Sequence, residues 1–157
     1  MKKISIFNQK GGVGKTTSNI NLCSYLALEG YKVLAIDIDP QGNTTSGLGF
    51  DKHKIEKSTY DVLTTDTELR EVIVQSQLLE NLYLAPSIME LAGAEVELTI
   101  SDSRETILKN KLKNIEGEYD FVFIDCPPSL GILTINALTA SDSVLIPIQS
   151  EFYALEG

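Results

Sequence analysis

The sequence contains no tryptophan, one histidine and two cysteines in 157 residues. Cys23 and Cys126 lie far apart and form no CxxC pattern, so we expect neither a disulfide framework nor a zinc site, and both should be small core residues. No hydrophobic run approaches the roughly 20 residues needed to cross a bilayer. The N-terminus carries two lysines but only a very short apolar stretch, which is not a secretory signal. We therefore expect a cytoplasmic protein.

Basic residues are also scarce, because 13 Lys and Arg stand against 22 Asp and Glu, which gives a net charge of −9. Contacts along a nucleic-acid backbone need clustered lysine and arginine, so this balance argues against strong non-specific DNA binding by this chain alone. The lysines fall mostly in residues 52–57 and 109–113. We interpret both clusters as solvated surface, with nucleic-acid contact as the alternative.

The hydrophobic pattern predicts strands that alternate with helices. A strand over residues 4–7, a helix over 16–29 that ends at Gly30, and a strand over 32–37 form a βαβ unit, which should be parallel and right-handed. Residues 41–58 read as a loop with some helix at its end, and Ser103 is a candidate helix cap. Further helices are predicted over 67–77, 88–98, 104–115 and 130–139, and further strands over 82–85, 119–125 and 143–148.

This alternation predicts an α/β fold with a doubly wound, mostly parallel sheet and helices on both faces. Residues 151–157 have the pattern of a helix that has just begun, so we do not expect the sheet to be complete at residue 157. We expect residues 1–157 to be a single domain whose C-terminal part lies further along a longer protein.

A glycine-rich loop lies between the first predicted strand and the first predicted helix. Its backbone N–H groups and the positive end of the helix dipole should point at one spot and bind phosphates. The glycines let the backbone approach closely, Lys15 can reach the outer phosphates, and the Thr16 hydroxyl can bind Mg²⁺. We therefore predict that the chain binds ATP with Mg²⁺ through Lys10, Gly11, Gly12, Val13, Gly14, Lys15, Thr16 and Thr17.

The loop departs in one respect from the common pattern GxxxxGK[ST]. Gln9 stands where that pattern has glycine, and a second lysine, Lys10, stands at the front of the loop. A lysine in this position is close enough to add positive charge to a phosphate site. In a monomer it can equally point into solvent.

Two further segments place acids at the ends of predicted strands, where α/β sheets bind their ligands. Asp37 and Asp39 follow the second strand and should share one side by alternation, so Asp39 at the loop edge can hold or orient a water for attack on the γ-phosphate. Asp125 follows the most hydrophobic strand and precedes two prolines that fix the next turn. Beside a phosphate loop, Asp125 suits Mg²⁺ or its bound water, whereas alone it would be a simple strand end.

Three segments together resemble the ParA/Soj family of partition ATPases, in the wider group with a deviant Walker A motif: KGGVGKTT, IDIDPQGN and FIDCPPSLG. The segments occur in the family's order and spacing. The start, NQKGGVGKTT, and the end, IPIQSEFYALEG, are similar too, so the resemblance covers essentially the whole chain. Family members run well past residue 157.

The resemblance implies a P-loop NTPase-like fold, a slow and partner-stimulated ATPase, and a role for each motif residue. Lys10 resembles the signature lysine that reaches the nucleotide of the other subunit, and Lys15 resembles the ordinary phosphate-binding lysine. Thr16 resembles the magnesium ligand, Asp39 the residue that positions the hydrolytic water, and Asp125 the Walker B acid. The catalytic residues are then Lys10, Lys15 and Asp39, and the magnesium site comprises Thr16, Asp39 and Asp125.

The resemblance also implies partners. Family members form homodimers on binding ATP, and the dimer binds DNA without sequence preference in chromosome or plasmid segregation. A ParB-type centromere-binding protein stimulates hydrolysis and resets the cycle. On this reading the parent protein is cytoplasmic, associates with the nucleoid and needs no membrane.

Three other readings stay open. A Min-type or flagellar-placement ATPase acts at a membrane and needs a C-terminal amphipathic helix. A redox relative such as the nitrogenase iron protein needs two cysteines that bridge a cluster, whereas Cys23 falls on the buried stripe of a predicted helix. A non-catalytic module would be gated by nucleotide without turning it over.

Overall fold

The computed structural model describes residues 1–100 and 103–150, so the helix expected at 151–157 lies outside the described residues. Within the described part, the strands form one six-stranded sheet in the order β3-β4-β2-β5-β1-β6. All neighbours are parallel except β3 and β4. The strands are β1 (Lys2–Ile6), β2 (Val33–Asp37), β3 (Val74–Gln75), β4 (Leu82–Ala85), β5 (Phe121–Asp125) and β6 (Ser143–Leu145).

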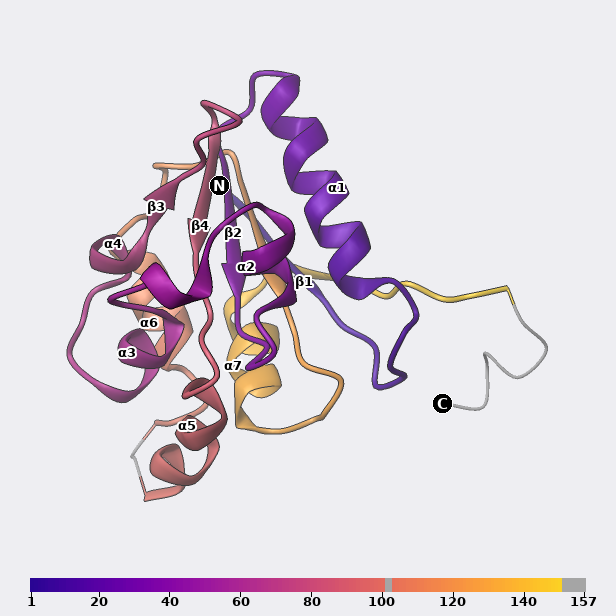
Figure 1. The fold of residues 1–157 in the computed structure, drawn as a ribbon. Coiled ribbons are helices and arrows are strands. Elements are labelled where there is room, and N and C mark those ends of the chain that lie inside the picture. The colour runs from indigo at the N-terminus through magenta and orange to yellow at the C-terminus, as the bar shows by residue number, and fades with distance from the viewer. Residues whose placement is uncertain (101–102, 151–157) are drawn as a thin grey trace.

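Helices cover both faces of this sheet, as predicted. Figure 1 shows α1 along one side and the helices α3, α5, α6 and α7 gathered on the other. The α-helices are α1 (Lys15–Leu28), α2 (Asn43–Gly47), α3 (Thr59–Thr64), α4 (Leu69–Val72), α5 (Leu91–Glu97), α6 (Ile107–Lys113) and α7 (Ile132–Ala140), with short 3₁₀ turns at η1 (Lys52–Lys54) and η2 (Leu98–Ile100). None of the helices in the described residues is long and apolar enough to span a membrane.

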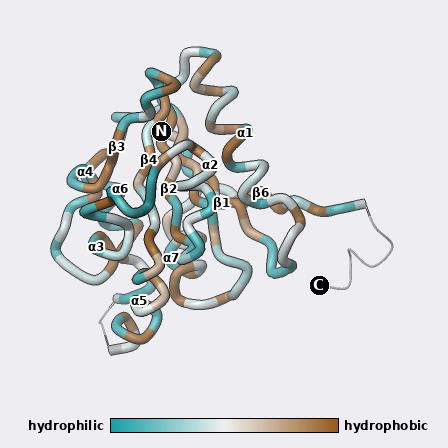
Figure 2. The backbone as a smooth tube through the Cα atoms, viewed as in Figure 1, coloured by the Kyte–Doolittle hydropathy of each residue, from teal (hydrophilic) through white to brown (hydrophobic). Residues whose placement is uncertain are grey.

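The central strand β2 is hydrophobic on both faces because each face packs against its own core. Leu34 and Ile36 belong to a cluster with residues of α3 to α7, whereas Val33 and Ala35 belong to a second cluster with Cys23 and Ala27 of α1. Continuous burial along a parallel strand is what this layered architecture requires. Figure 2 shows α1 as alternating hydrophobic and hydrophilic bands, which fits a helix with one buried face.

The strand register brings the ends of β1, β2 and β5 together. Asp125 is opposite Ile6 on one side and opposite Asp37 on the other. The loops that follow these three parallel strands therefore leave the sheet at the same edge (Figure 1). Parallel α/β sheets bind their ligands at this edge.

The helix predicted over 67–77 is wrong in its second half. Only α4, Leu69–Val72, is helical, and Val74–Gln75 then forms β3 antiparallel to β4. The run Val72-Ile73-Val74 is β-branched and favours an extended backbone, and pairing with β4 satisfies its backbone groups. The sheet therefore has one strand more than predicted.

The prediction that Ser103 caps a helix is also wrong. Ser103 has a left-handed φ of 59°, and α6 begins only at Ile107, after Thr106 as its N-cap. The N-cap position of α6 belongs to Thr106, so Ser103 lies before the helix rather than at its start. The stretch 41–58 also contains more helix than predicted, because α2 starts directly after Gly42. Sequence reasoning missed α3 altogether, although Ser58 and Asp61 form a capping box at its start.

Candidate phosphate site and acid pair

The loop between β1 and α1 has the backbone that its glycines permit. Gly12 and Gly14 have φ of 73° and 93°, a region that other residues rarely adopt, and Gly14 directly precedes the first residue of α1. A Cβ added at Gly11, Gly12 or Gly14 would meet no atom within 4 Å, so open space lies at these three positions, although Gln149 Nε2 donates to the Gly12 carbonyl at 3.1 Å. These glycines are thus needed for backbone shape and for access to the loop, rather than for tight packing.

The backbone amides of this loop are not used as donors within the described residues. In the part of the chain that the structure describes, no hydrogen-bond partner is found for the backbone N–H of residues 11–17, and the first loop donors that are used lie outside them, at Lys10 and Ser18. The start of a helix always leaves several N–H groups unpaired, and this loop extends that run by several residues. Such a run of free donors at a helix N-terminus suits an anion.

The two lysines of the loop differ in their surroundings. Lys15 is largely buried, and its Nζ donates to the Lys10 carbonyl oxygen at 3.1 Å, so the ammonium folds back over the loop. Lys10 is partly exposed, and no hydrogen bond or ion pair of its side chain is found among the described residues. Val13 is buried and Thr17 is exposed. Lys15 is therefore held at the loop, whereas no side-chain hydrogen bond or ion pair holds Lys10 among the described residues.

Asp125, at the end of β5, is completely buried, and only one of its two carboxylate oxygens has hydrogen-bond partners among the described residues. Its Oδ2 accepts from the Thr16 hydroxyl at 2.9 Å and from the Thr44 hydroxyl at 2.7 Å, whereas its Oδ1 is buried with no partner among the described residues. Burial raises the pKa of Asp125, and the hydrogen bonds from Thr44 and Thr16 oppose that rise. Oδ2 is thus held by two hydrogen bonds, whereas Oδ1 can still accept a ligand.

Sequence reasoning missed two polar residues behind Asp125. Asn19 and Thr44 are both fully buried, and Asn19 Nδ2 donates to Thr44 Oγ1 at 3.0 Å. The Cys23 thiol lies behind them and donates to Asn19 Oδ1 at 3.6 Å. The sequence of α1 could have indicated that Asn19 is buried. It lies at a spacing of four from Lys15 and Cys23, on the same buried helix face as Ala27. A polar residue inside a buried row needs a polar partner.

Asp37, the neighbour of Asp125 in the sheet, is satisfied on both oxygens. Its Oδ1 accepts from the Asp39 N–H at 3.1 Å, and its Oδ2 accepts from the Thr45 N–H at 2.8 Å and the Thr45 hydroxyl at 2.7 Å. Thr45 Oγ1 in turn accepts from the Ser87 N–H. Burial and then the charge of Asp125 raise the pKa of Asp37 to about 7. Asp37 therefore fixes the loop that follows β2.

Asp39 lies at the edge of the site, as the sequence predicted, although its side chain is largely buried. Its Oδ1 accepts from the Gln41 N–H at 2.9 Å, and its carbonyl oxygen accepts from the Ser87 hydroxyl at 2.7 Å. Asp39 and Asp125 are close enough for the charge of Asp39 to raise the pKa of Asp125. The structure thus brings Lys15, Thr16, Asp39 and Asp125 together at one edge of the sheet.

The donor set at this edge fits a magnesium ion held jointly with phosphates. In residues 1–100 and 103–150 no three His, Cys, Asp or Glu side chains gather as a metal cluster. Magnesium needs few protein ligands, because it keeps several waters and is shared with substrate phosphates. The open Oδ1 of Asp125 and the adjacent Thr16 hydroxyl suit that kind of site.

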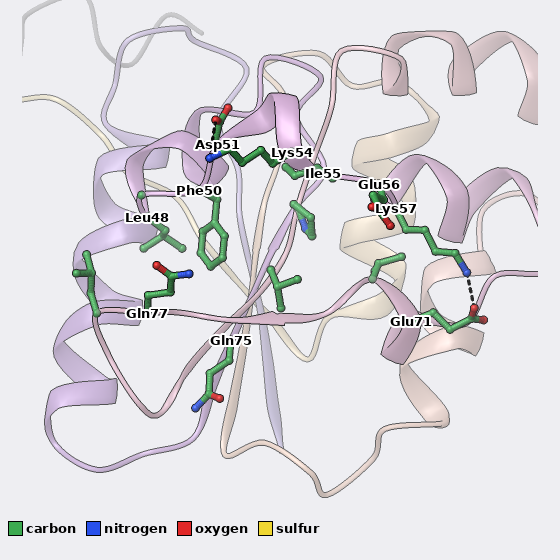
Figure 3. A pocket seen from close by; sticks show the side chains of 15 residues that line it. Leu48, Phe50, Asp51, Lys54, Ile55, Glu56, Lys57, Glu71, Gln75 and Gln77 are labelled. Carbon is green, nitrogen blue, oxygen red and sulfur yellow. Dashed lines mark hydrogen bonds and ion pairs between the residues drawn. The ribbon is translucent and has the colours of Figure 1, made fainter.

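A separate cavity of about 950 Å³ lies beside the free edge of the sheet, between the segment 48–57 and the segment 71–78. Figure 3 shows Gln77 beside Leu48 and Phe50, Gln75 on the far side of its strand, and the Lys57–Glu71 ion pair at one end. None of the predicted site residues lines this cavity. The lysines in 52–57 and 109–113 are mostly exposed, and Lys57 and Lys111 form ion pairs with Glu71 and Glu68.

Comparison with known proteins identifies the family of this chain. A family model described as an AAA domain (AAA_31) matches residues 1–157. The chain belongs to this family. It is 56% identical over 156 residues to the sporulation initiation inhibitor protein Soj of Bacillus subtilis, covering 99% of this chain and 61% of that protein. It is 51% identical over 154 residues to the chromosome partitioning protein ParA of Myxococcus xanthus, covering 98% of this chain and 54% of that protein.

The solved structures support the same fold. The crystal structure of cobyrinic acid a,c-diamide synthase from Mycobacterium smegmatis, with bound ATP analogue and magnesium, has a TM-score of 0.93 and 42% identity to this chain. The match covers 100% of this chain and 64% of that one. The predicted ParA/Soj resemblance and the P-loop NTPase-like fold are therefore confirmed. The chain spans about 54–61% of the length of the two curated relatives named above.

Proposed function

We propose that this chain is the nucleotide-binding part of a partition ATPase of the ParA/Soj type, which binds ATP with magnesium and hydrolyses it. The observation that carries the proposal is that two sets of polar groups at one edge of the sheet have no hydrogen-bond partner among the described residues. The amides of residues 11–17 and Oδ1 of Asp125 have no partner in residues 1–100 and 103–150, so the amides can donate to phosphate oxygens and Oδ1 can accept a cation. The bound ligands of the Mycobacterium smegmatis structure, an ATP analogue and magnesium, match both.

Each residue of the site has a task in this proposal. The amides of residues 11–17 and the Lys15 ammonium hold the phosphates, and Lys15 leaves the Lys10 carbonyl to do so. Thr16 and Asp125 hold the magnesium ion, which offsets the charge on the phosphates. Asp39 orients the attacking water, with its loop fixed by Asp37 and Ser87. The chain thus supplies position and charge rather than a covalent intermediate.

Dimerisation and partners complete the proposal. Lys10 is partly exposed, and we propose that it reaches the nucleotide of a second copy. ATP then favours the dimer because two chains share its negative charge. The names of the relatives, Soj and chromosome partitioning ParA, support a role in DNA segregation. We further propose that the ATP-bound dimer binds DNA at the nucleoid and that a ParB-type partner stimulates hydrolysis and resets the cycle.

The test measures ATP hydrolysis and DNA retention by the natural protein in its full length, beside its Asp39→Ala variant. We expect slow phosphate release that a ParB-type partner accelerates, and DNA binding that requires ATP. The Asp39→Ala variant should bind ATP and DNA but release no phosphate. Equal phosphate release by both proteins would refute the role of Asp39. Binding to anionic vesicles in place of DNA would refute the segregation role in favour of a membrane-associated ATPase.

A further inference from the structure

The carboxylate of Asp125 is oriented by two hydroxyls that differ in their freedom. Thr16 and Thr44 both donate to the same oxygen, Oδ2, at 2.9 and 2.7 Å. Thr16 is part of the phosphate loop and is partly exposed, whereas Thr44 is fully buried on α2. In the proposed function Thr16 also has to bind the magnesium ion. Thr44 is therefore the donor to Asp125 that has no second task.

Asn19 fixes the direction in which the Thr44 hydroxyl donates its hydrogen bond. Asn19 Nδ2 donates to Thr44 Oγ1 at 3.0 Å, and the Cys23 thiol donates to Asn19 Oδ1, which sets the orientation of the Asn19 amide. A hydroxyl has a single hydrogen. Because the Thr44 oxygen receives a hydrogen from Asn19, its own hydrogen is left for Asp125.

The position of α2 links the two acids of the site. Thr44 donates to Asp125 at the end of β5, and the next residue, Thr45, donates to Asp37 at the end of β2. Asp37 and Asp125 are opposite each other in the sheet. The helix α2, which begins at Asn43, is thus hydrogen-bonded to the ends of both strands, and Thr44 makes the bond to Asp125.

We propose that Thr44, oriented by Asn19, is a positioning residue for magnesium. Its hydroxyl holds Oδ2 of Asp125, so that the unpaired Oδ1 is turned toward the cation beside Thr16. This inference rests on the proposed function, because it assigns the residue that prepares the magnesium ligand of that same site. Partners behind a metal ligand typically change metal affinity by about 10- to 100-fold when removed.

The test is a magnesium titration of ATP binding by the purified full-length protein, followed with a fluorescent ATP analogue. Thr44→Val keeps the shape of the side chain and removes the hydroxyl, and Thr44→Ser keeps the hydroxyl. We expect Thr44→Val to need about tenfold more Mg²⁺ for half-maximal tightening of binding, with its affinity in EDTA unchanged. Thr44→Ser should stay within about threefold of the wild type.

A matched control lies on the same helix. Ser46 is exposed and its hydroxyl donates only to the Gly42 carbonyl at 3.2 Å, so Ser46→Ala should leave the magnesium dependence unchanged. If Thr44→Val does not fold, the pair Thr44→Ala and Thr44→Ser, which differ by one oxygen, gives the same comparison. Equal magnesium dependence with and without the hydroxyl would overturn the proposal. A wild-type protein that binds no ATP at any magnesium concentration would instead refute the proposed function, and this inference with it.

Discussion

Two neighbouring aspartates on the same sheet edge have opposite hydrogen-bonding states. Asp37 has three donors spread over both oxygens, whereas Asp125 has two donors on one oxygen and none on the other among the described residues. Both side chains are fully buried, so burial alone does not separate them. The hydrogen bonds of Asp37 make it a structural residue, whereas the lone oxygen of Asp125 fits the cation-binding role that we propose for it. Buried polar groups are otherwise almost always paired.

The largest expected effect comes from removing the charge of Asp125. We expect Asp125→Asn to weaken magnesium-dependent ATP binding by about 100-fold, because the amide offers the cation no negative charge. Without nucleotide, the variant should be at least as stable as the wild type, since it no longer buries a charge with an unpaired oxygen. A fluorescent-nucleotide titration and urea unfolding measure these two quantities. A large loss of stability without ligand would contradict the contrast with Asp37.

The second effect tests the closed cluster around Asp37. Thr45→Val removes one donor to Asp37 and leaves the buried Ser87 N–H without its acceptor. We expect the free energy of unfolding to fall by about 2 kcal/mol in urea, because an unpaired buried donor costs about 1–3 kcal/mol. Ser46→Ala, on the same helix, should change it by less than about 0.5 kcal/mol. If Ser46→Ala lowers the free energy of unfolding as much as Thr45→Val does, the loss comes from α2 itself rather than from the hydrogen bonds of Thr45 with Asp37 and Ser87.

The third effect is the pH dependence of stability without ligand. The pKa of Asp37 is raised from 3.8 to about 7, so between these values the folded state holds a proton that the unfolded state has released. Stability should therefore fall as pH rises through this range, by up to about 1.4 kcal/mol per pH unit, and this contribution should level off above pH 7. Asp37→Asn should reduce this slope, as measured by urea unfolding at several pH values, and Asp125, whose pKa burial also raises, contributes to the slope that remains. A curve with the same slope in both proteins would show that Asp37 is not the group that titrates.

The smallest effect concerns the two thiols behind the site. Burial raises the pKa of Cys126 to about 12 and raises that of Cys23 as well. Only the thiolate is reactive, so we expect almost no labelling of the folded protein by a disulfide reagent at pH 8 and labelling of both cysteines in urea. Rapid labelling of Cys23 in the folded state would show that the row behind Asn19 is open to solvent.

Much of the phosphate loop could be predicted because its chemistry is local. Lys15 and Thr16 follow glycines at the start of a helix, and the strand ends at Asp37 and Asp125 mark the ligand edge of a parallel sheet. Asn19 and Thr44 could not be assigned in the same way, since their partners are distant in sequence and depend on how α1 and α2 meet. Residues 74–75, in contrast, pair with the nearby residues 83–84, and the helix predicted over 67–77 missed this local antiparallel pairing.

Calorimetric titration of the wild type and of Lys15→Gln with ATP in excess Mg²⁺ tests the central claim most directly. The substitution gives an unbranched-stem, polar side chain that is one atom shorter, and it removes the charge that lies over the loop. We expect the wild type to bind ATP and Lys15→Gln to bind at least tenfold more weakly, since hydrogen bonds to charged groups contribute about 1.5–3 kcal/mol. Equal affinity of the two proteins, or no binding of ATP by the wild type, would contradict a triphosphate site at residues 10–17.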